Sequence, residues 1–428
     1  MEKSKNTIET RVYYGEYTLR HWIDLMLTRG LDLPEYQRSF VWDEEDVKRL
    51  LASIGSGQFI LPVTIAHYKD EDGERNLILD GQQRLTSILL AYLGFMPNKE
   101  KFKSQEKDLA NGDDSEEEEK DSSMEWTYKK LLKDNQNENT VLSIQGRLRD
   151  NDNYKALILT IDGDKEEFYD RTFLGFSFII PAKQEADATQ RYFSTLFRNM
   201  NYWGKKLSSL ESRRSLYFLN KEYKDYFDGK TVDGEDVLCN IKIIENMQPR
   251  KIDFVRYLSI LSQLMVVKNN DINRVMVGYS AYRSRESYYA DYVSLIMDLE
   301  QESRRDKFSG FNMERCFPNQ EWKDRFVIVK DFLERNKAKL GLDEKYGAFK
   351  SWIDADYWLF GLLDTVLFKG KTLVKEDELT TILVEEIDTK RQQKEKEKAT
   401  EYQKNPNRIG NLRERIKRSL DIYSGYAQ

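Results

Sequence analysis

The chain has 428 residues, of which 39% are hydrophobic, 33% charged and 12% aromatic, which predicts folded domains with a polar surface. The net charge of −6 excludes nucleic-acid binding by overall charge, although a local basic face stays open. No stretch approaches the roughly 18 apolar residues that a membrane span needs. Because Met1–Thr10 also lacks an apolar signal core, we expect a cytoplasmic protein.

The small number of cysteines and histidines limits the chemistry open to the chain. Cys239 and Cys316 form no Cys-x-x-Cys pair and are expected to be free thiols. His21 lies in a helical pattern and His67 in a strand pattern, so structural or surface roles are expected for both. A zinc hydrolase or a Ser-His-Asp enzyme would need one of these two histidines.

Helical and extended patterns alternate in the first hundred residues. An apolar stripe predicts a helix over Leu19–Met26, and Pro34 keeps Leu31–Trp42 extended. Asp43 is expected to cap a helix that ends at Gly55. The next expected elements are a strand at Leu61–Tyr68, a turn at Asp70–Gly73, a strand at Asn76–Asp80 and a helix that begins near Gln83.

The composition changes at Lys99–Glu125, which is acidic and poor in apolar residues. We predict a disordered insertion there, with an acidic segment that mimics DNA or docks a partner as the alternative. Further expected elements are strands at Lys155–Ile161 and Phe173–Pro181, a helix at Ala188–Asn201, and a helix opened by the capping-box spacing of Ser208 and Glu211.

From about Ile252 onward the pattern is almost wholly helical. The last helix, expected at Arg408–Tyr423, belongs to a basic stretch whose cations either contact phosphates or form a solvated helix face. These cations are Lys404, Arg408, Arg413, Arg415, Lys417 and Arg418. The predicted domain map is residues 1–98 and 126–230 as one domain, 99–125 as its insertion, and 231–428 as a helical domain.

Asp80-Gly81-Gln82-Gln83-Arg84 lies where a strand passes into a helix. The start of a helix leaves N–H groups without partners and carries partial positive charge, and a glycine lets a ligand approach the backbone. Arg84 adds donors suited to phosphate, and Asp80 could hold a metal ion or orient Arg84. The junction therefore suits a nucleotide. The alternative is structural: a salt bridge between Asp80 and Arg84, with Gln82 capping the helix.

Two other polar clusters could join this site. Tyr36-Gln37-Arg38 repeats the Gln-Arg pairing on an extended segment. Asn199 and Asn201 precede Gly204 and could equally mark the end of a helix.

Three stretches, LPEYQRSFVW, LILDGQQRLTSI and LFRNMNYWGKKLSSLESR, together resemble the GmrSD-type N-terminal domain family, also called domain-of-unknown-function family 262. The resemblance implies an α+β fold with a small mixed sheet like that of ParB and sulfiredoxin on the N-terminal side, ahead of the helical C-terminal domain. It also implies binding, and in several members hydrolysis, of a nucleoside triphosphate with Mg²⁺. The implied catalytic residues are Asp80, Gln83 and Arg84, with Asp80 as the metal ligand; the implied nucleotide-binding residues are Tyr36, Gln37, Arg38, Gly81, Gln82, Thr86, Asn199 and Asn201.

The resemblance places such chains in bacterial anti-phage systems that act on modified DNA. Full-length members carry, or pair with, an HNH-type nuclease that contains histidine, whereas this chain has no histidine after His67. We therefore expect a nucleotide-binding and hydrolysing module whose partners are modified phage DNA and a separate nuclease subunit, with oligomerisation open. The alternative is a catalytically silent module that binds DNA or a protein. Sulfiredoxin chemistry is disfavoured, because Gln82 and Gln83 stand where a reactive cysteine would be needed.

Overall fold

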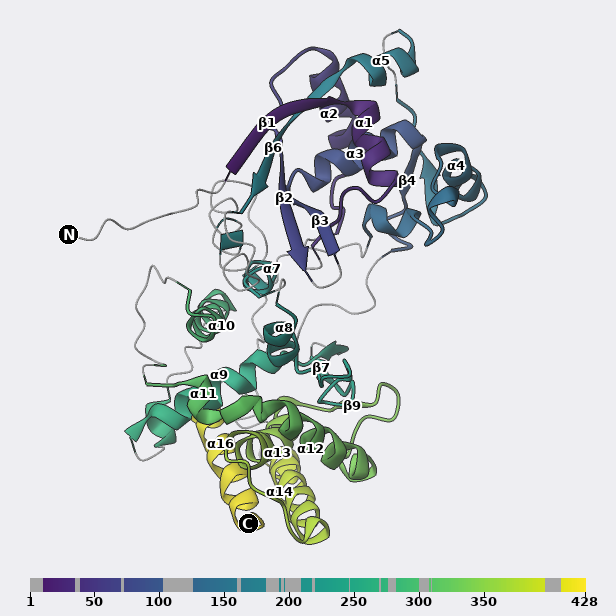
Figure 1. Ribbon diagram of the computed structural model, residues 1–428. Coiled ribbons are helices and arrows are strands. Elements are labelled where there is room, and N and C mark those ends of the chain that lie inside the picture. Colours follow the sequence, from purple (N-terminus) through teal and green to yellow (C-terminus); the bar gives the residue numbers. More distant parts are fainter. Residues whose placement is uncertain are drawn as a thin grey trace, which may run out of the picture. The chain divides into compact units, whose positions relative to one another are not determined.

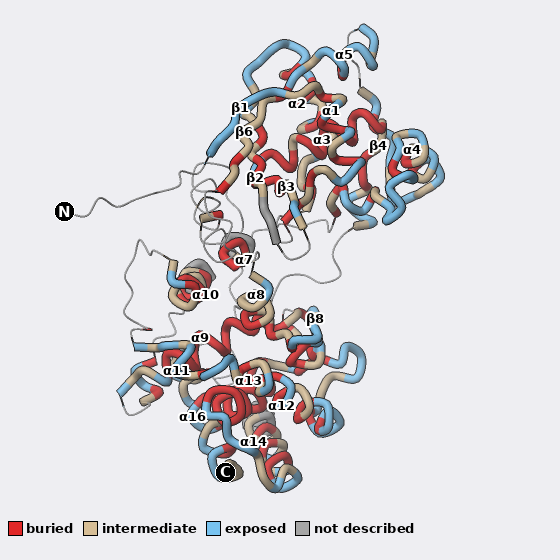
Figure 2. Tube along the Cα trace, in the orientation of Figure 1, coloured by how far each residue is buried: buried red, intermediate tan, exposed pale blue. Residues whose placement is uncertain are grey.

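A computed structural model describes residues 11–34, 39–70, 73–102, 126–159, 163–181, 192–193, 196, 209–217, 220–245, 247–268, 271–275, 282–299, 308, 310–396 and 409–428. The chain divides into two compact units, whose described residues lie within 11–217 and 220–428 (Figure 1). Each unit has its own buried interior (Figure 2). The combination of small mixed sheets with many helices confirms the predicted α+β class. Residues 103–125 of the predicted insertion lie outside the described residues.

A four-stranded mixed sheet forms the base of the first unit. Its strands are β1 (Arg11–Thr18), β2 (Val63–Asp70), β3 (Gly73–Asp80) and β6 (Phe173–Ile180). The order is β1-β6-β2-β3, in which β6 and β2 run parallel and the two outer pairs run antiparallel. The strands β2, β3 and β6 correspond to predicted strands, whereas the edge strand β1 was not predicted.

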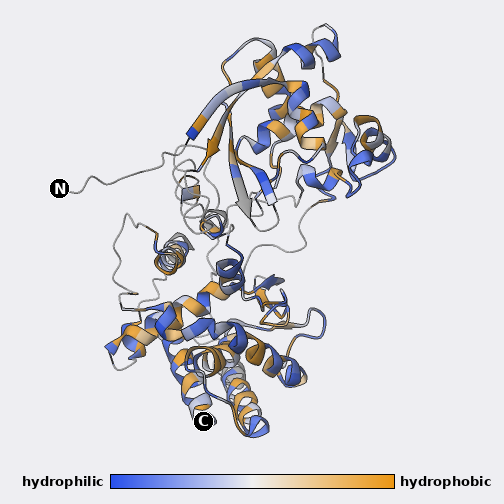
Figure 3. Ribbon diagram, viewed as in Figure 1, coloured by the Kyte–Doolittle hydropathy of each residue, from blue (hydrophilic) through white to orange (hydrophobic). Residues whose placement is uncertain are grey.

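Helices pack against this sheet to enclose the core of the first unit. They are α1 (Leu19–Leu27), α2 (Glu44–Gly55) and α3 (Gln82–Leu93). Trp22 of α1 is fully buried and donates from Nε1 to the carbonyl of Leu174 at 3.1 Å, which fixes α1 to β6. Asp43 caps α2 as predicted, accepting from the N–H of Asp46 at 2.9 Å. Figure 3 shows hydrophobic and hydrophilic residues interleaved along the helices, as amphipathic packing requires.

Shorter elements complete the first unit. They are β4 (Phe95–Pro97), the 3₁₀ turns η1 (Tyr128–Leu131) and η2 (Gln136–Glu138), α4 (Val141–Arg149), β5 (Tyr154–Ala156), α5 (Lys165–Arg171) and α7 (Ser209–Arg214). Of the strand predicted at Lys155–Ile161, only its start belongs to β5, and residues 160 and 161 lie outside the described residues. Its partner β4 has only three residues between Gly94 and Asn98, so the strand ends at Ala156, and Leu157 makes one last backbone bond, to the carbonyl of Gly94 at 2.8 Å.

The second unit is mostly helical, as predicted. Its main helices are α8 (Lys221–Asp228), α9 (Phe254–Val266), α10 (Tyr282–Ile296), α11 (Met313–Cys316), α12 (Trp322–Arg335), α13 (Trp352–Leu362), α14 (Glu376–Lys396) and α16 (Ile409–Ser424). α13 continues directly into a buried π-helical turn, η8 (Leu363–Phe368). A small sheet in the order β8-β7-β9 was not predicted; it contains β7 (Lys242–Glu245), β8 (Gln248–Lys251) and β9 (Ala348–Phe349).

A buried ion cluster joins three helices of the second unit. Asp356 of α13 receives two hydrogen bonds from Arg256 of α9, at 2.5 and 3.0 Å. Arg415 of α16 donates two more, at 3.0 and 2.9 Å, and the Tyr257 hydroxyl donates at 3.1 Å. Burial alone would raise the pKa of Asp356, but the two guanidinium groups lower it below its usual value. The carboxylate therefore stays charged and links α9, α13 and α16.

The basic residues of the C-terminal helix differ in their surroundings. Arg415 is fully buried in the ion cluster, and Arg413 donates to the carbonyl of Val275 at 2.7 Å. Arg418 forms an ion pair with Glu386 at 2.9 Å. Arg413 and Arg415 thus bond within the protein, whereas Lys417 and Arg418 are exposed, as the alternative of a solvated helix face predicts. Lys404 and Arg408 lie outside the described residues.

Candidate functional site

The Asp80–Arg84 motif lies at the turn between β3 and α3. β3 ends at Asp80, Gly81 adopts a left-handed conformation with φ +95°, and α3 begins at Gln82. A Cβ atom on Gly81 would lie 3.0 Å from Val63 Cγ2, so both the conformation and the crowding favour glycine. Because Gly81 occupies the cap position without a side chain, it cannot itself cap the first turn of α3.

Arg84 ties this turn to the entrance of β2. Its Nη2 donates to Asp80 Oδ2 at 2.5 Å, and its Nη1 donates to the carbonyls of Leu61 and, at 3.4 Å, Pro62. The Arg84 side chain is only 12% exposed, whereas that of Asp80 is 53% exposed. The structural alternative for this pair, a salt bridge, is thus present, and the carboxylate still faces solvent.

Gln83 has a different geometry from the one expected of a ligand-binding donor. Its Oε1 accepts from the N–H of Val41 and its Nε2 donates to the carbonyl of Ser39, each at 3.0 Å. The side chain is 8% exposed. Both ends of the amide therefore bind the backbone of a distant segment, and that segment directly follows Tyr36-Gln37-Arg38 in the sequence. Those three residues lie outside the described part of the chain.

The other predicted binding residues are distributed unevenly. Gln82 is buried at the first position of α3. Thr86, one turn further along, is fully buried, and its hydroxyl has no hydrogen-bond partner among the described residues. Asn199 and Asn201 lie outside the described residues. The structure thus brings together Asp80, Gly81, Gln82, Gln83 and Arg84, and places Thr86 in the interior beneath them.

The cysteines and histidines do not form a centre of their own. Cys239 and Cys316 are free thiols, as expected, and burial raises the pKa of each to about 11. His21 is exposed, and Nδ1 of His67 lies 3.2 Å from Oδ1 of Asn76. Within the described ranges, no group of three or more His, Cys, Asp or Glu residues could hold a metal ion. Any ion at the junction would need ligands beyond Asp80.

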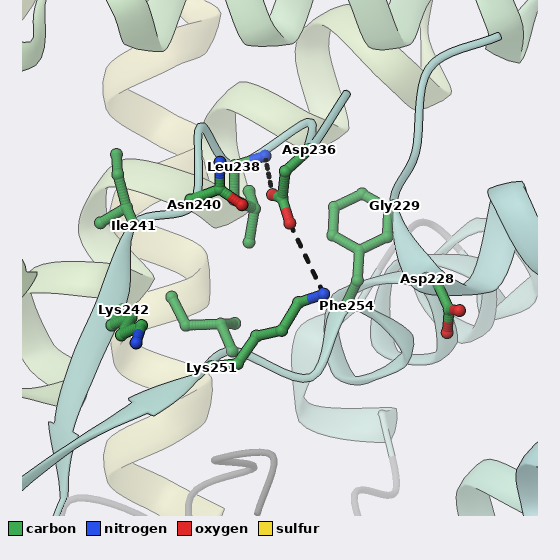
Figure 4. Close-up of a pocket in the computed structure, with 10 residues that line it drawn as sticks. Asp228, Gly229, Asp236, Leu238, Asn240, Ile241, Lys242, Lys251 and Phe254 are labelled. Atoms are coloured by element: carbon green, nitrogen blue, oxygen red, sulfur yellow. Dashed lines mark hydrogen bonds and ion pairs between the residues drawn. The ribbon is translucent and has the colours of Figure 1, made fainter. Parts of the chain in front are cut away.

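A pocket of about 260 Å³ in the second unit was not anticipated from the sequence (Figure 4). Leu238 and Phe254 contribute apolar walls. The Asp236 carboxylate accepts from the N–H of Leu238 at 2.8 Å and lies 3.5 and 3.6 Å from the ammonium groups of Lys230 and Lys251. The charge of this carboxylate is therefore already balanced, and the pocket geometry alone indicates no particular chemistry.

Comparison with known families finds a match within the first unit. Residues 23–218 match the family described as GmrSD restriction endonuclease, N-terminal domain. This match confirms, over these residues, the resemblance seen in the sequence. The matched stretch contains the whole β3–α3 junction, and the family description indicates a domain of a restriction system. No curated protein and no solved structure matches the chain. Among the described helices, none combines the length and apolar character needed to cross a membrane.

Proposed function

We propose that the chain is the nucleotide-binding module of a restriction-like system, and that it binds and hydrolyses a nucleoside triphosphate with Mg²⁺ at the β3–α3 junction. The observation that carries the proposal is the glycine-opened start of α3, with Arg84 and a solvent-facing Asp80 beside it. This arrangement lies in the stretch that matches the GmrSD N-terminal family. The start of a helix and an arginine together suit a polyphosphate.

The ion pair between Asp80 and Arg84 is compatible with this role. A pair with one partner half exposed contributes about 0–1 kcal/mol, whereas a charge-assisted contact to phosphate contributes about 1.5–3 kcal/mol. An arriving phosphate can therefore displace Asp80 from Arg84. The carbonyls of Leu61 and Pro62 would still hold the other end of the guanidinium in place.

Asp80 fits the part of a magnesium ligand. Mg²⁺ in nucleotide sites commonly takes one or two protein carboxylates and completes its shell with phosphate oxygens and water. When bound there beside Asp80, Mg²⁺ would supply positive charge to the phosphates. Hydrolysis would form a bond between a water oxygen and the terminal phosphorus and break the bond from that phosphorus to the bridging oxygen. The water proton would pass to solvent and the nucleoside diphosphate would leave. Arg84 would stabilise the negative charge on the phosphoryl group that is transferred.

Gln83 would act as a positioning residue in this scheme. Its amide is already bound to the backbone of Ser39 and Val41, so it would hold the segment after Tyr36-Gln37-Arg38 against the start of α3. In this proposal Gln37 and Arg38 complete the nucleotide site, and modified phage DNA and a separate nuclease subunit are the partners.

A thermal-shift panel with the four common nucleoside triphosphates tests the proposal, with EDTA in place of Mg²⁺ as the control. A ligand at a hundred times its Kd adds about 2.7 kcal/mol of stability. For a unit of this size that is a rise in Tm of roughly 5–10 °C. If no triphosphate shifts the melting curve at millimolar concentration, the proposal is wrong. Binding without phosphate release in the presence of modified DNA would favour the silent regulatory module instead.

A further inference from the structure

Two large apolar side chains stand exposed beside the junction. Phe59 is 82% exposed and Leu61 is 65% exposed, whereas Ile60 between them is partly buried and packs on the core. In an extended chain, residues two apart point to the same side. The alternation therefore places Phe59 and Leu61 together on the solvent side of the segment that enters β2.

This segment is fixed to the proposed phosphate site. The Leu61 carbonyl accepts from Arg84, and Thr64, three residues later, pairs with Asp80 in the sheet. Phe59 lies two residues before Leu61 in the sequence. In an extended chain the Cα atoms of two such residues are about 7 Å apart. The segment that carries the apolar pair is thus held next to the charged junction by Arg84 and by the pairing of Thr64 with Asp80.

We propose that Phe59 and Leu61 form the platform for the base of the bound nucleotide, so that the ligand is a purine nucleoside triphosphate. This inference rests on the proposed function. A nucleotide has charged phosphates at one end and a flat base at the other. Arg84 can bind the phosphates, and the exposed ring of Phe59 can stack on the base. Neither platform side chain has a hydrogen-bonding group, so the platform selects for ring area and does not discriminate between adenine and guanine.

The test compares ATP, GTP, UTP and inorganic triphosphate, each with Mg²⁺, by titration calorimetry on the full chain. Stacking on an aromatic side chain strengthens binding by roughly 5-fold to 150-fold. In wild type we expect ATP and GTP to bind more tightly than UTP, and UTP more tightly than inorganic triphosphate. Phe59→Ala should lose most of the preference for ATP and leave the affinity for inorganic triphosphate unchanged, and Phe59→Trp should keep the preference.

Leu142→Ala is the matched control, since Leu142 is also 82% exposed, on α4. It should change neither affinity, and the exposed position of Phe59 means that Phe59→Ala should melt like wild type. If Phe59→Ala keeps the preference for ATP, Phe59 does not bind the base and the inference is wrong, whereas the proposed phosphate site is unaffected by that result. If wild type binds neither ATP nor inorganic triphosphate, the proposed function itself fails. A wild-type dimer that Phe59→Ala converts to monomer, without change in ATP affinity, would assign the surface to a second copy of the chain and overturn the inference.

Discussion

Replacing Gln83 by leucine separates a positioning role from a catalytic one. The change removes two hydrogen bonds of 3.0 Å, one to the N–H of Val41 and one to the carbonyl of Ser39. At about 1 kcal/mol for each bond, Gln83→Leu should destabilise the first unit by about 2 kcal/mol. In a unit of roughly 200 residues this lowers Tm by about 4–8 °C.

Gln145→Leu provides the matched control for this substitution. The side-chain amide of Gln145 also bonds to the backbone, but it makes one hydrogen bond, from Nε2 to the carbonyl of Leu93 at 3.0 Å. It should cost about half as much, or about 1 kcal/mol. Hydrogen exchange measured by mass spectrometry gives the local readout, because the amide of Val41 should lose protection in Gln83→Leu and keep it in Gln145→Leu.

The outcome for nucleotide binding follows from the same geometry. Loosening the segment that follows Tyr36-Gln37-Arg38 should weaken triphosphate affinity along with stability. If Gln83→Leu melts like wild type, keeps Val41 protected and yet abolishes phosphate release, then Gln83 acts directly in the reaction and the positioning account is refuted.

Two further predictions concern Gly81 and the buried ion cluster. Gly81→Ala should cost about 1–3 kcal/mol in thermal unfolding, and more than Gly94→Ala, because a Cβ at Gly81 meets Val63 whereas one at Gly94 meets nothing within 4 Å. Asp356→Leu should cost about 3–5 kcal/mol, because Arg256 and Arg415 would remain buried without their carboxylate. Since the folded-state pKa of Asp356 is lowered, its stabilising contribution is present above the unfolded value of about 4 and is lost as pH falls through the folded value. Tm of the second unit should therefore fall in acid, and Asp356→Leu combined with Arg256→Met and Arg415→Met should lack this contribution.

Elements that carry their own signal could be predicted from the sequence. Helix α2 has an acidic capping residue, Asp43, and a stripe of Val47, Leu50, Leu51 and Ile54, all of which are buried. The β3–α3 junction was predictable because an apolar run, a glycine and a helical pattern of apolar residues follow one another in the chain. Such signals are local, so they need no knowledge of distant partners.

Features that depend on distant partners were missed. The edge strand β1 is exposed over most of its length, so it shows little of the alternation that marks a half-buried strand. The strands β7, β8 and β9 have two to four residues each, too few for a periodic pattern. Gln83 binds backbone more than forty residues away, and backbone partners leave no trace in residue type. Arg415 was also misplaced by its residue type. It belongs to a basic stretch for which phosphate contact was considered, but its side chain pairs with Asp356 in the core.

The central claim is that Arg84 binds the phosphates of a nucleoside triphosphate and that Asp80 serves in its hydrolysis, and one experiment addresses both residues. Affinity for Mg²⁺-ATP and the rate of phosphate release are measured side by side for wild type, Arg84→Ala and Asp80→Asn. Arg84→Ala should weaken binding by roughly tenfold to a hundredfold through loss of a charge-assisted contact to phosphate. Asp80→Asn should retain binding and lose most phosphate release, because it keeps its size and an oxygen but not the charge that holds Mg²⁺. Wild-type affinity in Arg84→Ala, or wild-type phosphate release in Asp80→Asn, would contradict the account.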